Sequence, residues 1–315
     1  MIPALVLTAG LATRLRPLSF VRAKAALPVA GLPLVQRILR WLAVHGVYDT
    51  VLNLHHLPHT ITAIAGDGSA DGVRVRYSWE PTVLGSAGGP RRALPLLGSS
   101  TFLIVNGDTL TNVDIPALVD DHRRSGAMVT MAAIPNAEPE KYSGLAVDGS
   151  GAFTGVVPRG SKEASYHFVG VQVAEAAAFA TLPDNRPFES VRQLYPNLIA
   201  THPGSVRTFA TQAEFFDIGT PADYLDTSLL FSTREPSGSA LPSAGLEDCV
   251  LWDDVDVGTN VHLRRCIVTD GVRIPDGAQF ENVTIRPAGG ELMPDERRAG
   301  PLAIGPIEIE KRRHR

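Results

Sequence analysis

One segment near the N-terminus constrains this chain more than any other. Residues 2–8 are apolar and predict a buried strand, which leads into a loop of small residues and then to two cations ten residues apart, Arg14 and Lys24. The loop consists of Ala9, Gly10, Leu11, Ala12 and Thr13. Small residues let backbone N–H groups approach phosphate oxygens closely, and the two cations can neutralise the charge that remains. We therefore expect this loop to bind a nucleoside triphosphate.

The same segment resembles the signature of the sugar-1-phosphate nucleotidyltransferases, the nucleotide-sugar pyrophosphorylases. Their pattern is roughly G-x-G-T-R-L-x-P-L-T, followed a few residues later by P-K-P. This chain matches it at Gly10, Thr13, Arg14, Leu15, Pro17, Leu18 and Lys24. It departs from the pattern at Ala12, where the second glycine is usual, and at Ala23 and Ala25, where prolines are usual. Ala12 is the departure that matters, because its methyl group can crowd the phosphates or disfavour a positive φ.

Two apolar strand patterns end in an aspartate. Residues 102–105 lead to Asp108, and residues 215–216 lead to Asp217. Carboxylates at strand ends beside a phosphate site suit Mg²⁺, which takes oxygen ligands and keeps waters and substrate phosphates. The resemblance also implies a metal-binding aspartate in G-D and another in D-x-G-T-P, and both motifs are present. We expect Asp108 and Asp217 to hold Mg²⁺; the alternative for each is a turn or helix cap.

A third motif resembles the nucleobase segment of the family, in which Gln or Glu precedes L-G-T-A-G. Here Glu80 precedes Leu84-Gly85-Ser86-Ala87-Gly88. The resemblance implies that the backbone of Gly85 and Ser86 meets the edge of the base. An ionised Glu80 only accepts hydrogen bonds, so it could pair with the adjacent N1–H and N2–H₂ donors of guanine. This favours GTP over UTP or dTTP.

The sugar-phosphate side matches the family less closely. Gly144 lies in a segment that resembles the family's Y-G, and Arg159 stands where the lysine of E-K-P is usual, with Lys162 as a rival phosphate ligand. Gly170 lies where N-A-G-I is usual. The glutamate and the asparagine of these motifs are missing, so the sugar stays open at this point.

Composition narrows the class of protein. The chain has 315 residues, 44% of them hydrophobic and 20% charged, with a net charge of −4, which does not suggest a nucleic-acid surface. It has no apolar run of about 18 residues, and residues 1–8 lack the flanks of a signal peptide. We therefore expect a cytoplasmic protein without a membrane span. Cys249 and Cys266 have no metal-ligand spacing, and we expect two buried thiols.

Strand and helix patterns alternate through the first two thirds of the chain. Strands are predicted at 2–8, 50–54, 73–79, 101–105 and 127–133, and helices at 33–45, 88–97 and 115–125, with Pro95 ending or bending the second helix. This alternation predicts an α/β domain over 1–231, with a Rossmann-like, mostly parallel sheet and helices on both faces. Ligands of such sheets bind at the carboxyl ends of the strands.

A different pattern follows. Residues 232–245 are small and polar and predict a linker. Over 246–286 apolar residues recur every six positions, at Cys249, Val255, Val261 and Ile267, and after a slip of one at Val272 and Ala278. Hexapeptide repetition is typical of a left-handed parallel β-helix, here of about two coils. We expect 287–315 to be a tail with one strand at 306–310. The β-helix edge makes a homodimer plausible.

The resemblance implies a reaction: an NTP and a sugar 1-phosphate give an NDP-sugar and pyrophosphate. The second pKa of a phosphomonoester is about 6, so the attacking oxygen is already anionic and needs no general base. Arg14, Lys24, Asp108 and Asp217 are the expected catalytic residues, acting by alignment and charge neutralisation. The first substrate hypothesis is mannose 1-phosphate with GTP, the second glucose 1-phosphate with UTP or dTTP, and the third an amino-sugar phosphate with UTP.

Two other functions compete with this hypothesis. A catalytically weak regulatory paralogue that binds nucleotide-sugar would explain Ala12 and the altered sugar motifs. A glycosyltransferase that uses nucleotide-sugars would need a D-x-D metal motif, but Asp108-Thr109-Leu110 lacks the second aspartate.

Overall fold

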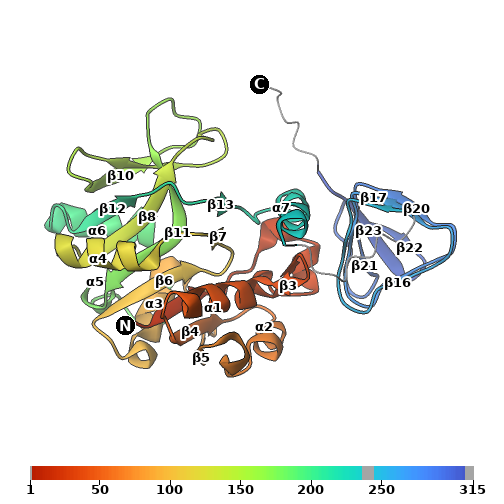
Figure 1. The fold of residues 1–315 in the computed structure, drawn as a ribbon, viewed down its shortest axis with the longest axis horizontal. Helices are drawn as coiled ribbons and strands as arrows, with labels where there is room; N and C mark the ends of the chain where they lie inside the picture. The colour runs from red at the N-terminus through yellow and green to blue at the C-terminus, as the bar shows by residue number, and fades with distance from the viewer. Residues whose placement is uncertain (1, 236–244, 309–315) are drawn as a thin grey trace. The chain divides into compact units, whose positions relative to one another are not determined.

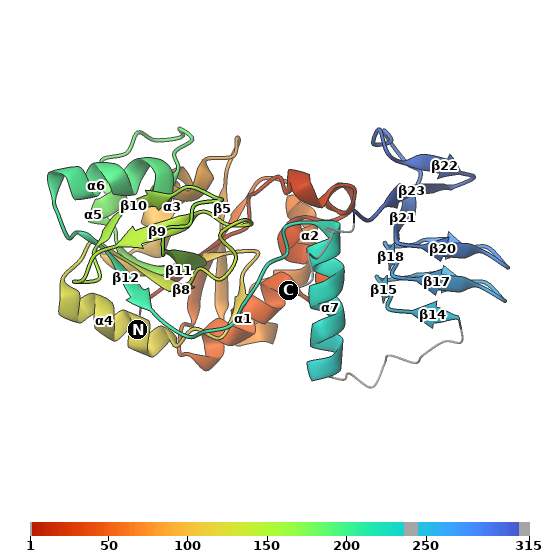
Figure 2. The same cartoon turned by 90° about the horizontal axis from the view of Figure 1, so that it is seen from above.

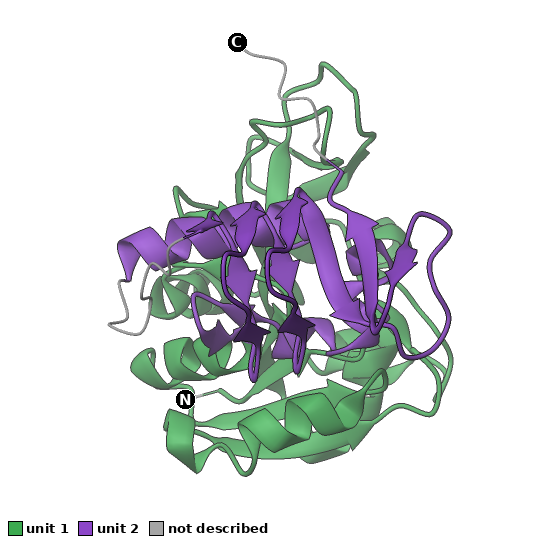
Figure 3. Ribbon diagram, turned by 90° about the vertical axis from the view of Figure 1, so that its right-hand side faces the viewer, with its two compact units in different colours: residues 1–10, 35–216 green, residues 11–34, 217–315 purple. Residues whose placement is uncertain are grey.

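The structure is a computed structural model that describes residues 2–235 and 245–308. Its contacts divide the chain into two units, which Figure 3 colours separately. Unit 1 comprises residues 1–10 and 35–216, and unit 2 comprises residues 11–34 and 217–315. The division falls within the predicted phosphate loop, because Gly10 belongs to unit 1 and Leu11 to unit 2.

A nine-stranded sheet forms the centre of unit 1, with the strand order β10-β9-β11-β6-β1-β4-β5, and β8 pairing with β11 and β12 (Figure 1). The strands are β1 (Ala4–Leu7), β4 (Asp49–Leu54), β5 (Arg74–Trp79), β6 (Thr101–Asn106), β8 (Val129–Pro135), β9 (Gly144–Val147), β10 (Phe153–Val157), β11 (Tyr166–Glu175) and β12 (Val206–Ala210). β1, β4, β5 and β6 are parallel to one another, which confirms the Rossmann-like arrangement. β11 is antiparallel to β6 and β8, and β9 to β10, so the sheet is mixed.

Helices cover both faces of this sheet. They are α1 (Leu34–Val44), α2 (Pro58–Ala65), α3 (Gly85–Leu97), α4 (Ile115–Ser125), α5 (Ala177–Ala180) and α6 (Tyr195–Thr201). Figure 2 shows α3, α5 and α6 on one face and α1 and α4 on the other. β1 is apolar along its whole length, and β6 is apolar from Phe102 to Val105, because both faces of these central strands are buried. Among the described residues, no helix combines the length and the apolar character that crossing a membrane requires.

Local sequence signals explain where two of these helices begin and end. The side chain of Asp114 accepts a hydrogen bond from the N–H of Ala117 at the start of α4, and Gly126 ends the helix in the left-handed region. α3 begins three residues before the predicted start. Pro95 does not end it, since the helix continues to Leu97 and stops at Gly98, which has a φ of 60°.

Unit 2 contains the predicted signature segment and the strands that follow the last helix. Three short 3₁₀ turns occupy Thr13–Leu15, Leu18–Phe20 and Lys24–Ala26, followed by β2 (Pro28–Val29) and β3 (Leu32–Pro33), which are antiparallel. α7 (Pro221–Arg234) is capped by the side chain of Thr220, which accepts a hydrogen bond from the N–H of Asp223. Most of the predicted linker at 232–245 lies outside the described residues.

The hexapeptide region forms a parallel β-helix. Its strands are β14 (Leu246–Glu247), β15 (Val250–Leu251), β16 (Asp256–Val257), β17 (His262–Arg264), β18 (Ile267–Val268), β19 (Arg273–Ile274), β20 (Gln279–Glu281) and β21 (Val283–Pro287). Figure 2 shows β14, β17 and β20 stacked as successive layers. Leu246 pairs with Leu263, and Leu263 with Phe280, so each coil takes 17 residues.

This 17-residue step corrects the position of the slip in the hexapeptide repeat. Since Val250 pairs with Ile267, the residue equivalent to Cys249 is Cys266 and not Ile267. The slip therefore lies between Val261 and Cys266. Cys266 is buried and Cys249 half-buried, both facing the β-helix core.

Residues with positive φ turn the corners of the coils. They recur at the same step: Asp248, Arg265 and Asn282; Asp254 and Gly271; Asn260 and Gly277. Gly, Asn and Asp tolerate the left-handed region better than other residues. Arg265 is the exception at these corners, and its guanidinium forms an ion pair with Asp226 of α7 at 2.9 Å.

The segment predicted to be a tail contributes two more strands. β23 (Leu302–Pro306) is antiparallel to both β21 and β22 (Arg297–Ala299). The strand predicted at 306–310 thus lies four residues earlier. Because it is antiparallel to β21, it ends the parallel stacking of the β-helix. Arg286 of β21 forms a buried ion pair with Glu296, the residue before β22 (2.6 Å). It also donates to the carbonyls of Gly289 and Glu291.

We expect Arg286→Met to destabilise unit 2, because it leaves the Glu296 carboxylate buried without its cationic partner. Such a loss costs about 3–5 kcal/mol. Urea unfolding followed by tryptophan fluorescence should show that Arg286→Met unfolds at a lower urea concentration than the wild-type protein. Arg297→Met, at an exposed position of β22, is the control and should change stability by no more than about 0.5 kcal/mol. Equal unfolding of the two variants would contradict the importance of this ion pair.

Candidate active site

Asp108 lies at the carboxyl end of the sheet. β6 ends at Asn106, and the N–H of Gly107 donates to the carbonyl of Leu7 at 2.9 Å, so the chain turns directly past the end of β1. The Asp108 side chain is half-buried in this turn. The carboxyl ends of central strands are where ligands bind in α/β sheets, and Asp108 is therefore in the expected place.

A chain of hydrogen bonds joins the ends of β1, β4 and β5 to the start of α3. The side-chain oxygen of Asn53 accepts from the N–H groups of Thr8 (2.6 Å) and Ala9 (3.3 Å). Its amide nitrogen donates to Oε1 of Glu80 at 2.7 Å, and Oε2 of Glu80 accepts from the N–H of Leu84 at 2.8 Å. The first residues of the phosphate loop and the predicted base segment are thus held by one network.

Glu80 occupies the centre of this network and not its surface. Its side chain is 0% exposed, and both oxygens are used by Asn53 and Leu84. Burial raises the pKa of the Glu80 carboxyl, and the two hydrogen bonds partly oppose this rise. This geometry does not support the expected pairing of Glu80 with a base, since the carboxylate would have to give up both bonds.

A glycine that the sequence analysis did not single out makes room for Glu80. A Cβ on Gly89 of α3 would lie 2.8 Å from Oε1 of Glu80 and 3.0 Å from the amide nitrogen of Asn53. The Gly88-Gly89 pair is the sequence signal that could have indicated this contact. Adjacent glycines inside a helix cost stability and indicate that another group approaches the backbone closely.

Gly85 and Ser86 form the first turn of α3. In the part of the chain that the structure describes, no hydrogen bond takes up their backbone N–H groups. The hydroxyl of Ser86 donates to Glu189 at 2.8 Å and accepts from the N–H of Ser190 at 2.9 Å. The two N–H groups point out of a helix N-terminus, which favours a hydrogen-bond acceptor.

The contact with Ser86 changes the interpretation of the segment around Glu189. Glu189, Arg192 and Tyr195 fit a helix surface by sequence. In the structure Glu189 contacts Ser86, and Tyr195 is fully buried with its hydroxyl donating to Gln172 at 2.7 Å. The segment changes from a π-helix (Ser190–Leu194) to an α-helix (Tyr195–Thr201), so the ordinary helical spacing could not show which side faces inward.

Of the predicted sugar-phosphate residues, Gly170 lies beside the Asp108 turn. It has a φ of +81° within β11, and a Cβ there would overlap the Thr109 side chain and lie 3.0 Å from the amide nitrogen of Asn106. β11 therefore passes directly against the end of β6. Gly144 begins β9 and pairs with Val157 of β10. Arg159 and Lys162 are both exposed in the segment after β10.

The remaining predicted catalytic residues belong to unit 2. Arg14 is exposed in the first 3₁₀ turn, Lys24 is half-buried at the start of the third, and Asp217 is half-buried before α7. A Cβ on Gly219 would lie 3.1 Å from Oδ2 of Asp217 and 3.3 Å from Nη1 of Arg14. The Arg14 guanidinium and the Asp217 carboxylate therefore both lie beside the bare backbone of Gly219.

Ala12 adopts the conformation for which the usual glycine is suited. Its φ is 48° and its ψ 45°, in the left-handed region, immediately before the first 3₁₀ turn. Left-handed backbone costs about 1–2 kcal/mol for a residue with a Cβ. The loop therefore keeps the expected shape despite the methyl group.

The predicted metal ligands are two carboxylates. Among the described residues, no group of three or more His, Cys, Asp or Glu side chains could hold a metal ion. Asp108 belongs to unit 1 and Asp217 to unit 2. A hard divalent ion that completes its shell with waters and substrate phosphates needs only one or two protein carboxylates.

Comparison with known proteins gives the family. The model of the Nucleotidyl transferase family matches residues 3–233, and that of the GlmU-like, C-terminal hexapeptide family matches residues 225–282. The first match covers the sheet, the signature segment and both aspartates. The chain belongs to the nucleotidyl transferase family.

Several relatives cover much of the chain. Mannose-1-phosphate guanylyltransferase of Mycobacterium tuberculosis is 26% identical over 310 residues, which are 98% of this chain and 81% of that protein. UTP–glucose-1-phosphate uridylyltransferase of Synechocystis is 24% identical over 86% of this chain and 76% of its own length. N-acetylmuramate alpha-1-phosphate uridylyltransferase of Neisseria meningitidis is 46% identical, but over only 36% of this chain and 50% of that protein.

A solved structure shows the same fold. HddC from Yersinia pseudotuberculosis superposes with a TM-score of 0.64, at 22% identity, over 73% of this chain and all of that one.

We expect Ala12→Gly to stabilise the phosphate loop. Glycine adopts the left-handed conformation without the steric cost of alanine, which is about 1 kcal/mol. Isothermal titration with NTP and Mg²⁺ should show tighter binding by up to about fivefold. Gly10→Ala is the matched variant, because it adds a methyl group to the same loop. At this position φ is not positive and a Cβ would have no neighbour within 4 Å. Weaker binding by Ala12→Gly would contradict the strain.

Glu80→Gln should weaken the network at the sheet end. Asn53 cannot turn its amide, because its oxygen already accepts from Thr8 and Ala9. One pair then places two donors against each other, at a cost of about 1–3 kcal/mol. Thermal unfolding measures the loss. Asp49→Asn, in an exposed pair with Arg74, is the control, expected to lose at most about 1 kcal/mol.

The same variant should change the pH dependence of stability. The pKa of Glu80 is higher in the folded than in the unfolded chain, so the folded state binds this proton more tightly. The contribution of Glu80 to stability therefore declines as the pH rises from the ordinary glutamate range through the raised pKa. Glu80→Gln should remove this decline; an unchanged pH profile would contradict the burial of an ionisable Glu80.

Proposed function

We propose that this chain transfers a nucleoside monophosphate from an NTP to a sugar 1-phosphate, giving an NDP-sugar and pyrophosphate. The observation that carries the proposal is the signature segment, whose Arg14 lies beside the same glycine, Gly219, as Asp217, in a chain whose relatives are named as transferases of this class. Such a reaction draws on the nucleotide pool of the cytoplasm, where we place the protein.

Asp108 and Asp217 are the proposed ligands of Mg²⁺. β7 (Leu110–Thr111) and β13 (Phe215–Phe216) are antiparallel, and Leu110 pairs with Phe216. Asp108 precedes Leu110 by two residues and Asp217 follows Phe216 directly, so both carboxylates belong to the same end of this pair by connectivity. When bound, Mg²⁺ neutralises charge on the reacting phosphates.

The chain's own groups account for the rest of the reaction. An anionic oxygen of the sugar 1-phosphate forms the new bond to the α-phosphorus, and the bond from that phosphorus to the pyrophosphate oxygen breaks in line. No general base is needed, because the phosphomonoester has a second pKa of about 6. Arg14 and the N–H groups of the loop neutralise the leaving pyrophosphate, and Lys24 aligns the α-phosphate with the sugar phosphate.

Base recognition is assigned to the start of α3. The N–H groups of Gly85 and Ser86 suit a base acceptor such as O6 of guanine or a pyrimidine carbonyl, and Glu80 positions this turn through Leu84. GTP with mannose 1-phosphate remains the first hypothesis, supported by the name of the relative that covers 98% of the chain. UTP comes second, supported by the two uridylyltransferase relatives.

Pyrophosphate release tests the function. With Mg²⁺ and a grid of five NTPs and several sugar 1-phosphates, we expect one productive pair. Asp108→Asn should lower its kcat/KM at least about a hundredfold, because charge on the phosphates is then less well neutralised. Asp120→Asn, in an exposed pair on α4, should leave turnover unchanged, and EDTA should abolish it.

Two outcomes would contradict this assignment. Turnover and Mg²⁺ dependence that survive Asp108→Asn would remove that residue from the metal site. No pyrophosphate release from any pair, together with binding of nucleotide-sugars, would favour the regulatory paralogue.

A further inference from the structure

Arg22 lies in the signature segment two residues before Lys24. Its side chain contacts the β-helix and is only 12% exposed. Its guanidinium binds Asp270 through two hydrogen bonds, Nε to Oδ2 and Nη2 to Oδ1, both 2.7 Å long. Nη2 also contacts Oδ2 of Asp253 at 2.5 Å. A guanidinium held by two carboxylates in this way has little freedom to move.

The two carboxylates come from successive coils of the β-helix. Asp253 and Asp270 are 17 residues apart, the length of one coil, and the N–H of Asp253 donates to Oδ1 of Asp270 at 3.1 Å. Like charges at such a short separation repel each other. Arg22 offsets this repulsion, so the contact between the segment and the coils is complementary in charge.

A second line of contacts reaches the other side of Lys24. The Arg22 guanidinium lies 5.4 Å from the ring centroid of Trp252, within the range of a cation–π interaction. Trp252 is buried, and its Nε1 donates to the hydroxyl of Tyr224 at 2.8 Å. That hydroxyl donates in turn to the carbonyl of Pro28 at 2.5 Å. Arg22 and Pro28, on either side of Lys24, are therefore tied to the same tryptophan of the first coil.

A third contact holds the segment further upstream. Two guanidinium groups lie over the Phe20 ring, that of Arg16 at 5.1 Å and that of Arg286 at 5.5 Å from its centroid. Arg286 is fixed by its buried ion pair with Glu296. The segment from Arg16 to Pro28 thus has three attachments to α7 and the β-helix.

We propose that the β-helix positions Lys24 for the transfer, and that Arg22 is the positioning residue through which it does so. The inference rests on the proposed role of Lys24. Only one residue separates Arg22 from Lys24, so loosening Arg22 displaces the lysine, and a misplacement of about 1 Å can lower a rate a hundredfold. The β-helix is then a part of the catalytic apparatus and not only a cap.

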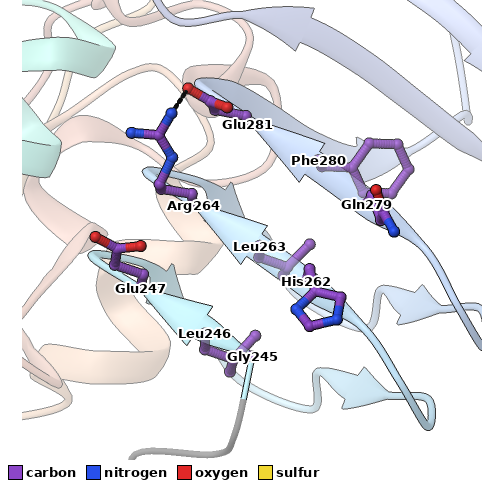
Figure 4. Close-up of a pocket in the computed structure, with 9 residues that line it drawn as sticks. All are labelled: Gly245, Leu246, Glu247, His262, Leu263, Arg264, Gln279, Phe280 and Glu281. Carbon is purple, nitrogen blue, oxygen red and sulfur yellow. Dashed lines mark hydrogen bonds and ion pairs between the residues drawn. The ribbon is translucent and has the colours of Figure 1, made fainter.

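An ion pair elsewhere on the β-helix provides a control that distinguishes this positioning role from a general effect on stability. Arg264 and Glu281 are also 17 residues apart and join successive coils. They belong to the face formed by β14, β17 and β20, where they line a surface pocket with Leu246, His262 and Phe280 (Figure 4). Among the described residues, this pair has no hydrogen bond or ion pair with the signature segment.

The experiment compares the full-length protein with the double variant Asp253→Asn/Asp270→Asn, with Arg22→Met and Arg22→Lys, and with the control Arg264→Met. Hydrogen exchange of the peptides that cover residues 16–28 gives a readout that needs no substrate. Steady-state kinetics with the productive NTP and sugar 1-phosphate give kcat and KM.

We expect exchange in residues 16–28 to be about tenfold faster in the double variant and in Arg22→Met. Their kcat should fall about ten- to hundredfold, with the KM for the NTP changed less than about twofold. Arg22→Lys, which keeps one charge, should recover part of kcat. Arg264→Met should leave both exchange and kcat unchanged, even where its melting temperature falls as much.

Unchanged exchange and kcat in the double variant would overturn the proposal, as would an equal loss of kcat in Arg264→Met. If the wild-type protein turns over no substrate pair, the proposed function fails, but the exchange measurement still decides the coupling. Faster exchange of residues 16–28 in the double variant alone then supports it, and unchanged exchange overturns it.

Discussion

The arrangement of the loops at the sheet end depends on the hydrogen bonds of the Asn53 side-chain amide. Its oxygen can only accept and its nitrogen can only donate, and each has partners on a different element. The first residues after β1 and the carboxylate before α3 are thereby held in one orientation. Since these segments begin the predicted phosphate loop and the turn to which we assign base recognition, a single amide sets their spacing.

Much of the architecture could be predicted from the sequence, because burial on both faces gives the parallel strands their apolar runs. The signature residues were identified by resemblance to the family. The two aspartates were identified by their places after apolar strands and by the same resemblance, and the coils of the β-helix by their six-residue spacing. The antiparallel strands β9 to β11 were not predicted. β9 and β10 are short and have no regular period, and Gly170 and Gln172 interrupt the apolar run of β11.

The role of Glu80 was beyond sequence reasoning for a different reason. A carboxylate has the same hydrogen-bonding capacity whether it faces a ligand or the protein interior, and its partner Asn53 is 27 residues away in the chain. Arg22 is similar, since its partners are more than 200 residues away. Pairings over such distances depend on packing and leave no periodic pattern in the sequence.

The 17-residue coil limits how the length of this protein can change in evolution. A coil inserted before Asp270 would carry that carboxylate one layer away from Arg22, about 4.8 Å in the direction of strand pairing. A coil inserted between Asp270 and Arg286 would leave Asp253, Asp270 and Trp252 where they are, but it would carry Arg286 one layer away from Phe20. The contacts of Arg22 and Phe20 therefore set the number of coils between Trp252 and Arg286.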